Sequence, residues 1–190
     1  MTSRRFPFGI PDGWFPVAYS DELAAGAVLR TRYFARELVL FRTESGRAAV
    51  LDAYCPHLGA HLGVGGKVVG ETIQCPFHGW QYGHDGACVK IPYSADVPSK
   101  VRARSWPVVE RNGAVLVWHD SEGRPPRFEI PVFPEWQAAD WTPTYERYTW
   151  QVRTHPQEIM ENAIDWPHFE RVHAMVAPHE RTERFHGALF

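Results

Sequence analysis

Two short blocks of sequence, each with one cysteine and one histidine, most constrain how this chain can fold. The first is Cys55-Pro56-His57 and the second is Cys75-Pro76-Phe77-His78, with 17 residues between His57 and Cys75. Thiolate and imidazole groups are both ligands of transition metals. A proline after each cysteine fixes the local φ angle, and the glycines after each block allow a close backbone approach. The blocks therefore predict two stiff loops that share one metal centre.

The order of ligands within the blocks indicates which metal centre. Zinc sites usually pair cysteine with cysteine and histidine with histidine along the chain, whereas each block here mixes the two types. Mixed loops suit a two-iron cluster, with Cys55 and Cys75 on one iron and His57 and His78 on the other. A structural zinc module and a set of ordinary structural residues are the competing interpretations.

The residues around these blocks read as short strands. Glu37 to Thr43 and Ala48 to Tyr54 predict one hairpin, joined by a turn that contains Gly46. Trp106 to Glu110 and Ala114 to Trp118 predict a second hairpin, because the Asn112-Gly113 pair between them tolerates positive φ. The pattern favours a small all-β domain that carries two long functional loops.

The composition changes after this β region. Prolines crowd the segment 121–135, which reads as an extended connection. We therefore expect a domain over 1–120, a proline-rich connection over 121–135 and the beginning of a second domain over 136–190. In this last part, Tyr148 to Val152 predicts a strand. Thr154 predicts the N-cap of a helix, with Pro156 in its first turn.

A second group of metal-binding side chains lies in the predicted helix: Asn162, Asp165, His168 and His173. On a straight helix, His168 and His173 would point about 140° apart and could not share a metal ion. Pro167 removes a helical hydrogen bond and clashes with a preceding carbonyl, so the helix must bend or break just before His168. The two imidazoles could then converge beside Asp165.

With both groups in view, the chain resembles the Rieske non-heme iron oxygenases. Its C-x-H and C-x-x-H blocks match the Rieske motif at all four ligand positions, and residues 162–173 look like that family's N-x-x-D-x-x-H-x4-H signature. General similarity near Leu51 to Cys55, Ile91 to Tyr93 and Val117 to Gly123 is greatest to the branch of 3-ketosteroid 9α-hydroxylases and cholesterol 7-desaturases. The resemblance implies a mainly β chain, with an all-β Rieske [2Fe-2S] domain followed by the start of an α+β catalytic domain of the helix-grip type.

The resemblance also implies roles for individual residues. Cys55, His57, Cys75 and His78 would hold the [2Fe-2S] cluster, while His168 and His173 would supply two arms of a 2-His-1-carboxylate site for mononuclear Fe(II). Asp165 would bridge this iron's histidine to the Rieske histidine of a neighbouring subunit in a head-to-tail homotrimer. Asn162 occupies the family's asparagine position.

The implied function is that of an oxygenase component. A NAD(P)H-dependent reductase or a ferredoxin would deliver electrons through the cluster to the Fe(II), which activates O2 to hydroxylate or desaturate an apolar substrate, with a steroid as the expected class. The alternative is a Rieske-type electron-transfer protein, or a truncated fragment without oxygenase activity.

The composition of the chain bears on its cellular compartment and on the classes of partner it could bind. Lys and Arg total 20 against 22 Asp and Glu, a net charge of -2, so nothing favours a nucleic-acid partner. No run of 18 apolar residues predicts a membrane span. Three cysteines make no disulfide framework, so we expect a cytoplasmic protein.

One part of the family's pattern is missing. In the family, the carboxylate of the iron site comes from an aspartate far downstream, but only 17 residues follow His173 here. Glu180 and Glu183 are the acids in that stretch, and we interpret both as solvated side chains. We therefore expect an incomplete catalytic domain, which would need a downstream part for catalysis.

Several other residues have simpler interpretations. His61 and His84 read as ordinary loop residues, and Cys88 as a small buried residue. Lys100, Arg102 and Arg104 alternate with apolar residues, as in the solvated face of a strand or in a strip that docks an acidic electron donor. Trp80, close to His78, is expected to shield the cluster from water.

Overall fold

The computed structural model describes residues 9–140 and 147–176. The chain divides into two compact units. One spans Pro11–Pro143, and the other combines Met1–Ile10 with Thr144–Phe190. Each unit is described by itself below.

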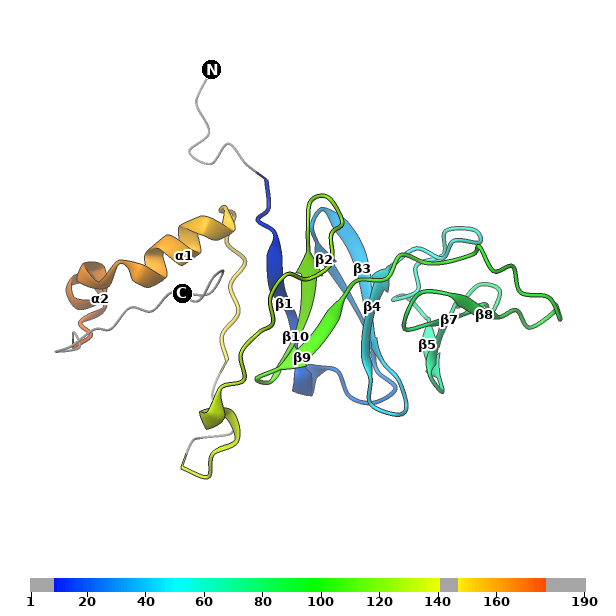
Figure 1. Ribbon diagram of the computed structural model, residues 1–190, viewed down its shortest axis with the longest axis horizontal. Helices are drawn as coiled ribbons and strands as arrows, with labels where there is room; N and C mark the ends of the chain where they lie inside the picture. Colours follow the sequence, from blue (N-terminus) through cyan, green and yellow to red (C-terminus); the bar gives the residue numbers. More distant parts are fainter. Residues whose placement is uncertain (1–8, 141–146, 177–190) are drawn as a thin grey trace, which may run out of the picture. The chain divides into compact units, whose positions relative to one another are not determined.

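The first unit is an arrangement of three small antiparallel sheets (Figure 1). The first sheet has the order β1-β10-β9, the second β2-β3-β4 and the third β5-β6-β7-β8. The strands are β1 Gly13–Tyr19, β2 Val28–Tyr33, β3 Arg36–Arg42, β4 Ala48–Asp52, β5 Lys67–Val69, β6 Thr72–Gln74, β7 Gln81–Gly83, β8 Cys88–Lys90, β9 Val108–Arg111 and β10 Ala114–His119. Two short 3-10 helices, Ser20–Glu22 and Pro134–Gln137, complete the unit.

The second sheet separates two hydrophobic cores. Side chains alternate between the faces of a strand, so in β3 Leu38 and Leu40 join one core while Val39 and Phe41 join the other. Both faces are therefore buried, which explains why the sequence of β3 reads as a continuous apolar run. One core contains the strands of the first sheet, and the other contains Cys55, Cys75 and the strands that flank them.

Both predicted hairpins form, with bounds within about two residues of the expected ones. β3 pairs with β4, and β9 pairs with β10. At the turn between β9 and β10, Asn112 and Gly113 have φ angles of +52° and +75°. Positive φ at both central residues is the type I′ geometry that matches the twist of the flanking strands. The same Asn112 side chain holds the proline-rich segment: its Nδ2 donates to the carbonyl of Pro131, at 2.8 Å, and its Oδ1 accepts from the N–H of Phe133, at 3.0 Å.

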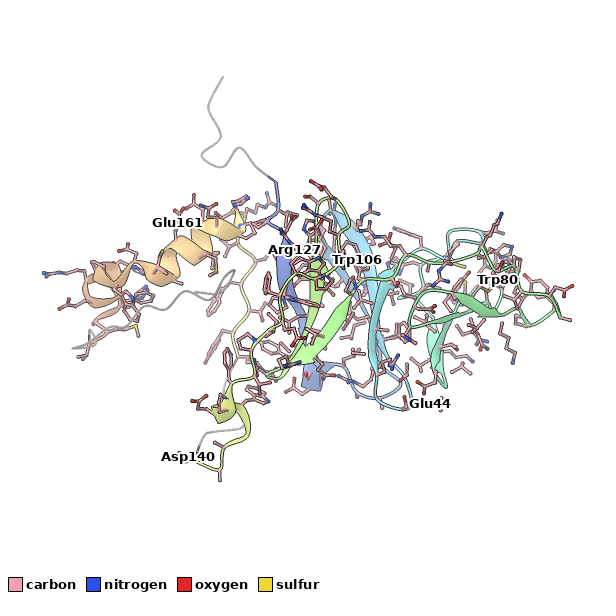
Figure 2. All side chains as sticks on the ribbon, in the orientation of Figure 1. Glu44, Trp80, Trp106, Arg127, Asp140 and Glu161 are labelled. Carbon is pink, nitrogen blue, oxygen red and sulfur yellow. The ribbon has the colours of Figure 1, made fainter. Side chains whose placement is uncertain are left out.

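The third sheet carries the two cysteine–histidine loops. Figure 1 shows β5, β7 and β8 beyond β4, on the side away from β1 and β10. In Figure 2, Trp80 lies in this region, whereas Trp106 lies among the first two sheets, in agreement with the core to which each belongs. The expectation of a mainly β chain is confirmed.

The second unit contains two short helices, α1 Pro156–Ile164 and α2 Trp166–His173. The predicted interruption is present: α1 ends before Asp165, whose φ and ψ of -82° and 74° are not helical. Pro167 lies in the first turn of α2, where its missing N–H costs no hydrogen bond. The expected N-cap at Thr154 is wrong. The cap is His155, because its imidazole Nδ1 accepts a hydrogen bond from the N–H of Gln157, at 3.3 Å.

The strand expected over Tyr148 to Val152 is also wrong. Residues 147–152 are exposed and form no strand. The alternation of Tyr148, Trp150 and Val152 imitates one apolar face of a strand, but within the described residues no neighbouring strand pairs with this segment. A strand needs such a partner for its backbone hydrogen bonds. No helix among the described residues combines the length and apolar character needed to cross a membrane.

Candidate iron-binding sites

The two cysteine–histidine loops share one backbone conformation. In each, the cysteine N–H donates to the carbonyl five residues on, and the N–H of the glycine four residues on donates to the cysteine carbonyl. The distances are 2.8 and 2.9 Å in the loop of Cys55, and 2.8 and 3.1 Å in the loop of Cys75. The glycines, Gly59 and Gly79, have φ angles of +74° and +72°, which side chains other than glycine rarely adopt. The two loops are thus equivalent although their histidines stand at different positions.

The loops bring like ligands together. The side chains of Cys55 and Cys75 are buried in the same core, and the rings of His57 and His78 lie with their centroids 4.8 Å apart. Among the described residues, no three His, Cys, Asp or Glu side chains converge on a single ion. A two-iron cluster requires two pairs of ligands instead, one for each iron. The paired thiols and paired imidazoles fit that requirement.

The surroundings of the thiols supply hydrogen bonds to sulfur. Burial raises the pKa of Cys75, and hydrogen bonding from the backbone N–H groups of Phe77 and His78 opposes this rise. Cys55 Sγ lies 3.1 Å from the hydroxyl of Tyr82. Burial also raises the pKa of Tyr82, so its hydroxyl keeps its proton and can donate to a thiolate at Cys55. The sequence analysis missed Tyr82, although its position just after the second loop was a usable signal.

Trp80 covers the histidine of the other loop. Its indole ring stacks on His57, with centroids 4.3 Å apart and planes 9° apart. The sequence predicted that Trp80 shields the cluster from water, and the structure shows which candidate ligand its ring covers. Its Nε1–H donates to the hydroxyl of Tyr93, at 2.6 Å. Tyr93 lies in a stretch that carries the family resemblance, but the sequence did not predict its contact with Trp80.

The second predicted site lies in the second unit. The rings of His168 and His173 have centroids 5.3 Å apart. His168 Nδ1 donates to the backbone carbonyl of Asp165 at 2.6 Å and lies 3.6 Å from its carboxylate. His168 Nε2 is buried and has no hydrogen-bond partner among the described residues. A ring whose Nδ1–H is held in this way presents the lone pair of Nε2, which is how histidine binds a metal, so the geometry of His168 fits a metal-ligand role.

Asn162 takes part in this region through its backbone carbonyl, next to Asp165. Its carbonyl accepts the N–H of Asp165 where α1 ends, at 3.4 Å. The Asp165 carboxylate is exposed. Glu180 and Glu183 lie outside the described residues.

The residues with simpler interpretations are placed as follows. His61 Nδ1 accepts the N–H of Gly63 at 3.0 Å, and His84 contacts Arg47 at 2.7 Å. Both are loop residues, and Cys88 is a buried member of the core. Arg102 pairs with Asp85 at 2.8 Å and Arg104 lies over the ring of Trp106 at 4.3 Å. Two of the three cations in the predicted basic strip therefore have partners within the domain.

Two family models match the chain. Residues 13–107 match the Rieske [2Fe-2S] domain, and residues 117–189 match the 3-ketosteroid 9α-hydroxylase C-terminal domain. The first match covers both cysteine–histidine loops, and the second covers both helices.

Curated proteins and solved structures agree with these matches. The cholesterol 7-desaturase of Bombyx mori is 43% identical over 95% of this chain and 39% of its own length. The probable 3-ketosteroid-9-alpha-monooxygenase oxygenase component of Rhodococcus rhodochrous is 39% identical over 85% of this chain and 41% of its own length. The crystal structure of dicamba monooxygenase matches 60% of this chain and 38% of its own, with a TM-score of 0.53 and 31% identity.

The chain spans about two fifths of the length of the curated relatives it matches. Its matched part contains the cysteine–histidine loops, the core that holds them and the helical histidines. The chain therefore belongs to the Rieske non-heme iron oxygenase family, in the branch of the 3-ketosteroid 9α-hydroxylases and cholesterol 7-desaturases.

Proposed function

We propose that this chain is part of the oxygenase component of a Rieske non-heme iron oxygenase that hydroxylates or desaturates an apolar substrate, with steroids as the substrate class. The observation that carries the proposal is the pair of equivalent loops, which bury two thiols in the same core and bring the centroids of two imidazole rings to 4.8 Å. The similarity to cholesterol 7-desaturases and 3-ketosteroid 9α-monooxygenases supports the substrate class.

In this proposal, Cys55 and Cys75 hold one iron of the [2Fe-2S] cluster, and His57 and His78 hold the other. The closed loops fix the four ligands before metal binds, since their backbone conformation is set by internal hydrogen bonds. Tyr82 and the backbone N–H groups of the second loop donate to the thiolates, which stabilises negative charge on sulfur.

His168 and His173 are the proposed protein ligands of the mononuclear Fe(II). When bound, the two metal groups supply one-electron transfer and O2 activation. The carbonyl of Asp165 holds the His168 ring so that Nε2 is available to the metal. We propose that the exposed Asp165 carboxylate bridges to the Rieske histidine of a neighbouring subunit in a homotrimer. Asn162 supports the break between the helices that brings these groups together.

The proposed electron donor is a NAD(P)H-dependent reductase, a ferredoxin, or both in series. The matched structures include the reduced complex between oxygenase and ferredoxin in carbazole 1,9a-dioxygenase, with a TM-score of 0.51 and 28% identity. We also propose a cytoplasmic location, because all three cysteines are free and thiols stay reduced in that compartment.

The test combines metal analysis with one substitution. The purified chain should show the absorption and reduced-state EPR of a Rieske cluster, and the oxygenase component that contains this chain should hold three irons per two sulfides. A colourless protein that holds zinc would exclude the proposal. In that oxygenase component, supplied with a reductase, O2 and a 3-ketosteroid or cholesterol, His168→Ala should abolish product and leave the cluster spectrum intact. Collapse of the spectrum in this variant would show that the two metal sites are not separate.

An electron-transfer protein without oxygenase activity is the second candidate. It is favoured by the contrast between the well-packed core around the cluster loops and the two helices, which bury no residue. Two irons per two sulfides in the oxygenase component that contains this chain, with a normal Rieske signal and no product, would establish this candidate in place of the first.

A further inference from the structure

Three aromatic side chains form a chain of contacts from a proposed cluster ligand to the surface. The ring of His57 stacks on Trp80, and the indole N–H of Trp80 donates to the hydroxyl of Tyr93. Trp80 is only 9% exposed, whereas Tyr93 is 64% exposed. The nearly buried indole N–H of Trp80 therefore has as its hydrogen-bond acceptor a largely exposed residue, Tyr93.

The segment that carries Tyr93 is held against the second loop. Ser94 closes a turn, since its N–H donates to the carbonyl of the buried Ile91, at 3.2 Å, and its hydroxyl donates to the carbonyl of Asp96, at 2.8 Å. Pro92 packs directly on Gly79: a Cβ added at Gly79 would lie 2.9 Å from Pro92 Cγ. This close approach places the Tyr93 hydroxyl within reach of the indole.

We infer that Tyr93 is a positioning residue for the cluster ligand His57. A stacked ring can slide or rotate in its plane unless a directional contact fixes it, and the hydrogen bond from Nε1 to Tyr93 is such a contact. With the indole fixed, its face sets the plane of the imidazole. The orientation of a histidine ligand and the contacts around it tune the metal that it binds. The inference deepens the proposed function and rests on it.

The main test is Tyr93→Phe in the full chain with its cluster. This change keeps the ring and removes the oxygen that accepts the indole N–H. We expect a broadened reduced-state EPR signal and an altered nitrogen hyperfine coupling from one of the two histidines, with the coupling of the other unchanged. The thermal unfolding midpoint should stay close to that of the unchanged protein, which distinguishes positioning from a general loss of stability.

Tyr54→Phe is the matched control. Tyr54 is 55% exposed and directly precedes Cys55, but its ring contacts His61 and not a proposed ligand. This variant also loses one exposed hydroxyl near the cluster, and its EPR signal should match that of the unchanged protein. Equal spectra for Tyr93→Phe and Tyr54→Phe would overturn the inference.

A double-mutant cycle tests whether Tyr93 acts through Trp80. Trp80→Phe removes the indole N–H, so adding Tyr93→Phe to it should change the EPR signal no further. If Tyr93→Phe has its full effect in the Trp80→Phe background, the proposed route through the indole is wrong.

A measurement on the metal-free full chain separates this inference from the proposed function. The ring current of Trp80 should shift the His57 ring protons upfield in NMR spectra. Tyr93→Phe should reduce that shift, and Tyr54→Phe should not. If no Rieske signal is found in the unchanged protein, the proposed function fails, and the NMR comparison still decides whether Tyr93 positions His57. Identical shifts in both variants would overturn the inference.

Discussion

The two candidate iron sites rest on very different amounts of packing. All buried apolar residues of the described chain lie between Val17 and Trp118, in the β-rich unit. Neither α1 nor α2 buries a residue, and their apolar side chains, such as Met160 and Val172, are exposed. Isolated helices of eight or nine residues are marginal in water, so the helices depend on whatever covers their apolar side. The candidate cluster ligands are therefore held by a core within the β-rich unit, whereas among the helical histidines His168 is held by a local hydrogen bond to the carbonyl of Asp165.

The largest expected effect tests the ligand pairs directly. Cys75→Ser should remove the Rieske absorption completely, because a serine hydroxyl does not replace a soft thiolate ligand of iron. Cys88→Ser is the matched control, as Cys88 is buried in the same core but lies outside both loops. It should keep the cluster. Loss of the spectrum in both variants would mean that the core, and not the ligand, controls the signal.

The difference in packing predicts a difference in stability. Leu38 is fully buried in β3, and Leu38→Ala should lower the free energy of unfolding by about 2–5 kcal/mol. Ile164 is 54% exposed at the end of α1, and Ile164→Ala should lower the free energy of unfolding by less than about 0.5 kcal/mol. Urea unfolding curves give both values. A similar loss in the two variants would show that Ile164 is covered in solution and would remove the contrast between the regions.

Tyr82 should raise the reduction potential of the cluster. Its hydroxyl contacts Cys55 Sγ, and a hydrogen bond to a charged acceptor contributes roughly 1.5–3 kcal/mol. Since about 1.4 kcal/mol corresponds to about 59 mV for one electron, Tyr82→Phe should lower the midpoint potential by at least ~60 mV. Tyr33→Phe, which alters the other core, should leave it unchanged in the same redox titration. An unchanged potential in Tyr82→Phe would contradict a donated bond.

The smallest expected effect concerns acid stability of the β-rich unit. Burial of the Asp120 carboxylate opposes its ionisation, but hydrogen bonds from Arg124 and from the N–H groups of Arg124 and Glu122 lower its pKa to about 2. A carboxyl group whose folded pKa lies below its unfolded value of about 3.9 stabilises the fold above that value. This contribution should disappear as the pH falls from about 4 to about 2. Asp120→Asn should flatten that part of the stability profile, as followed by tryptophan fluorescence. If the stability of Asp120→Asn fell with pH in parallel with that of the unchanged protein, the proposed contribution of Asp120 would be wrong.

Much of the β-rich unit could be predicted because its signals are local. Asn112-Gly113 fixes a two-residue turn whatever surrounds it, and the apolar runs of β3 and β4 predict buried strands. The same reasoning failed at Tyr148 to Val152, where the alternation was present but no described strand pairs with it. It also failed at Thr154, because an imidazole one residue later took the capping position. In both cases a non-local or competing partner decided the outcome.

The sequence by itself determined the types and spacing of the candidate ligands and the break between the two helices, because cysteine, histidine and proline act through their own chemistry and backbone restrictions. Tertiary structure alone decided which groups contact those ligands. The contacts of Tyr82 with Cys55 and of Trp80 with His57 span 27 and 23 residues of sequence, and they depend on how the third sheet packs its loops. The position of Tyr82 just after the second loop was a local signal, but its pairing with Cys55 and that of Trp80 with His57 follow from the fold of the whole unit.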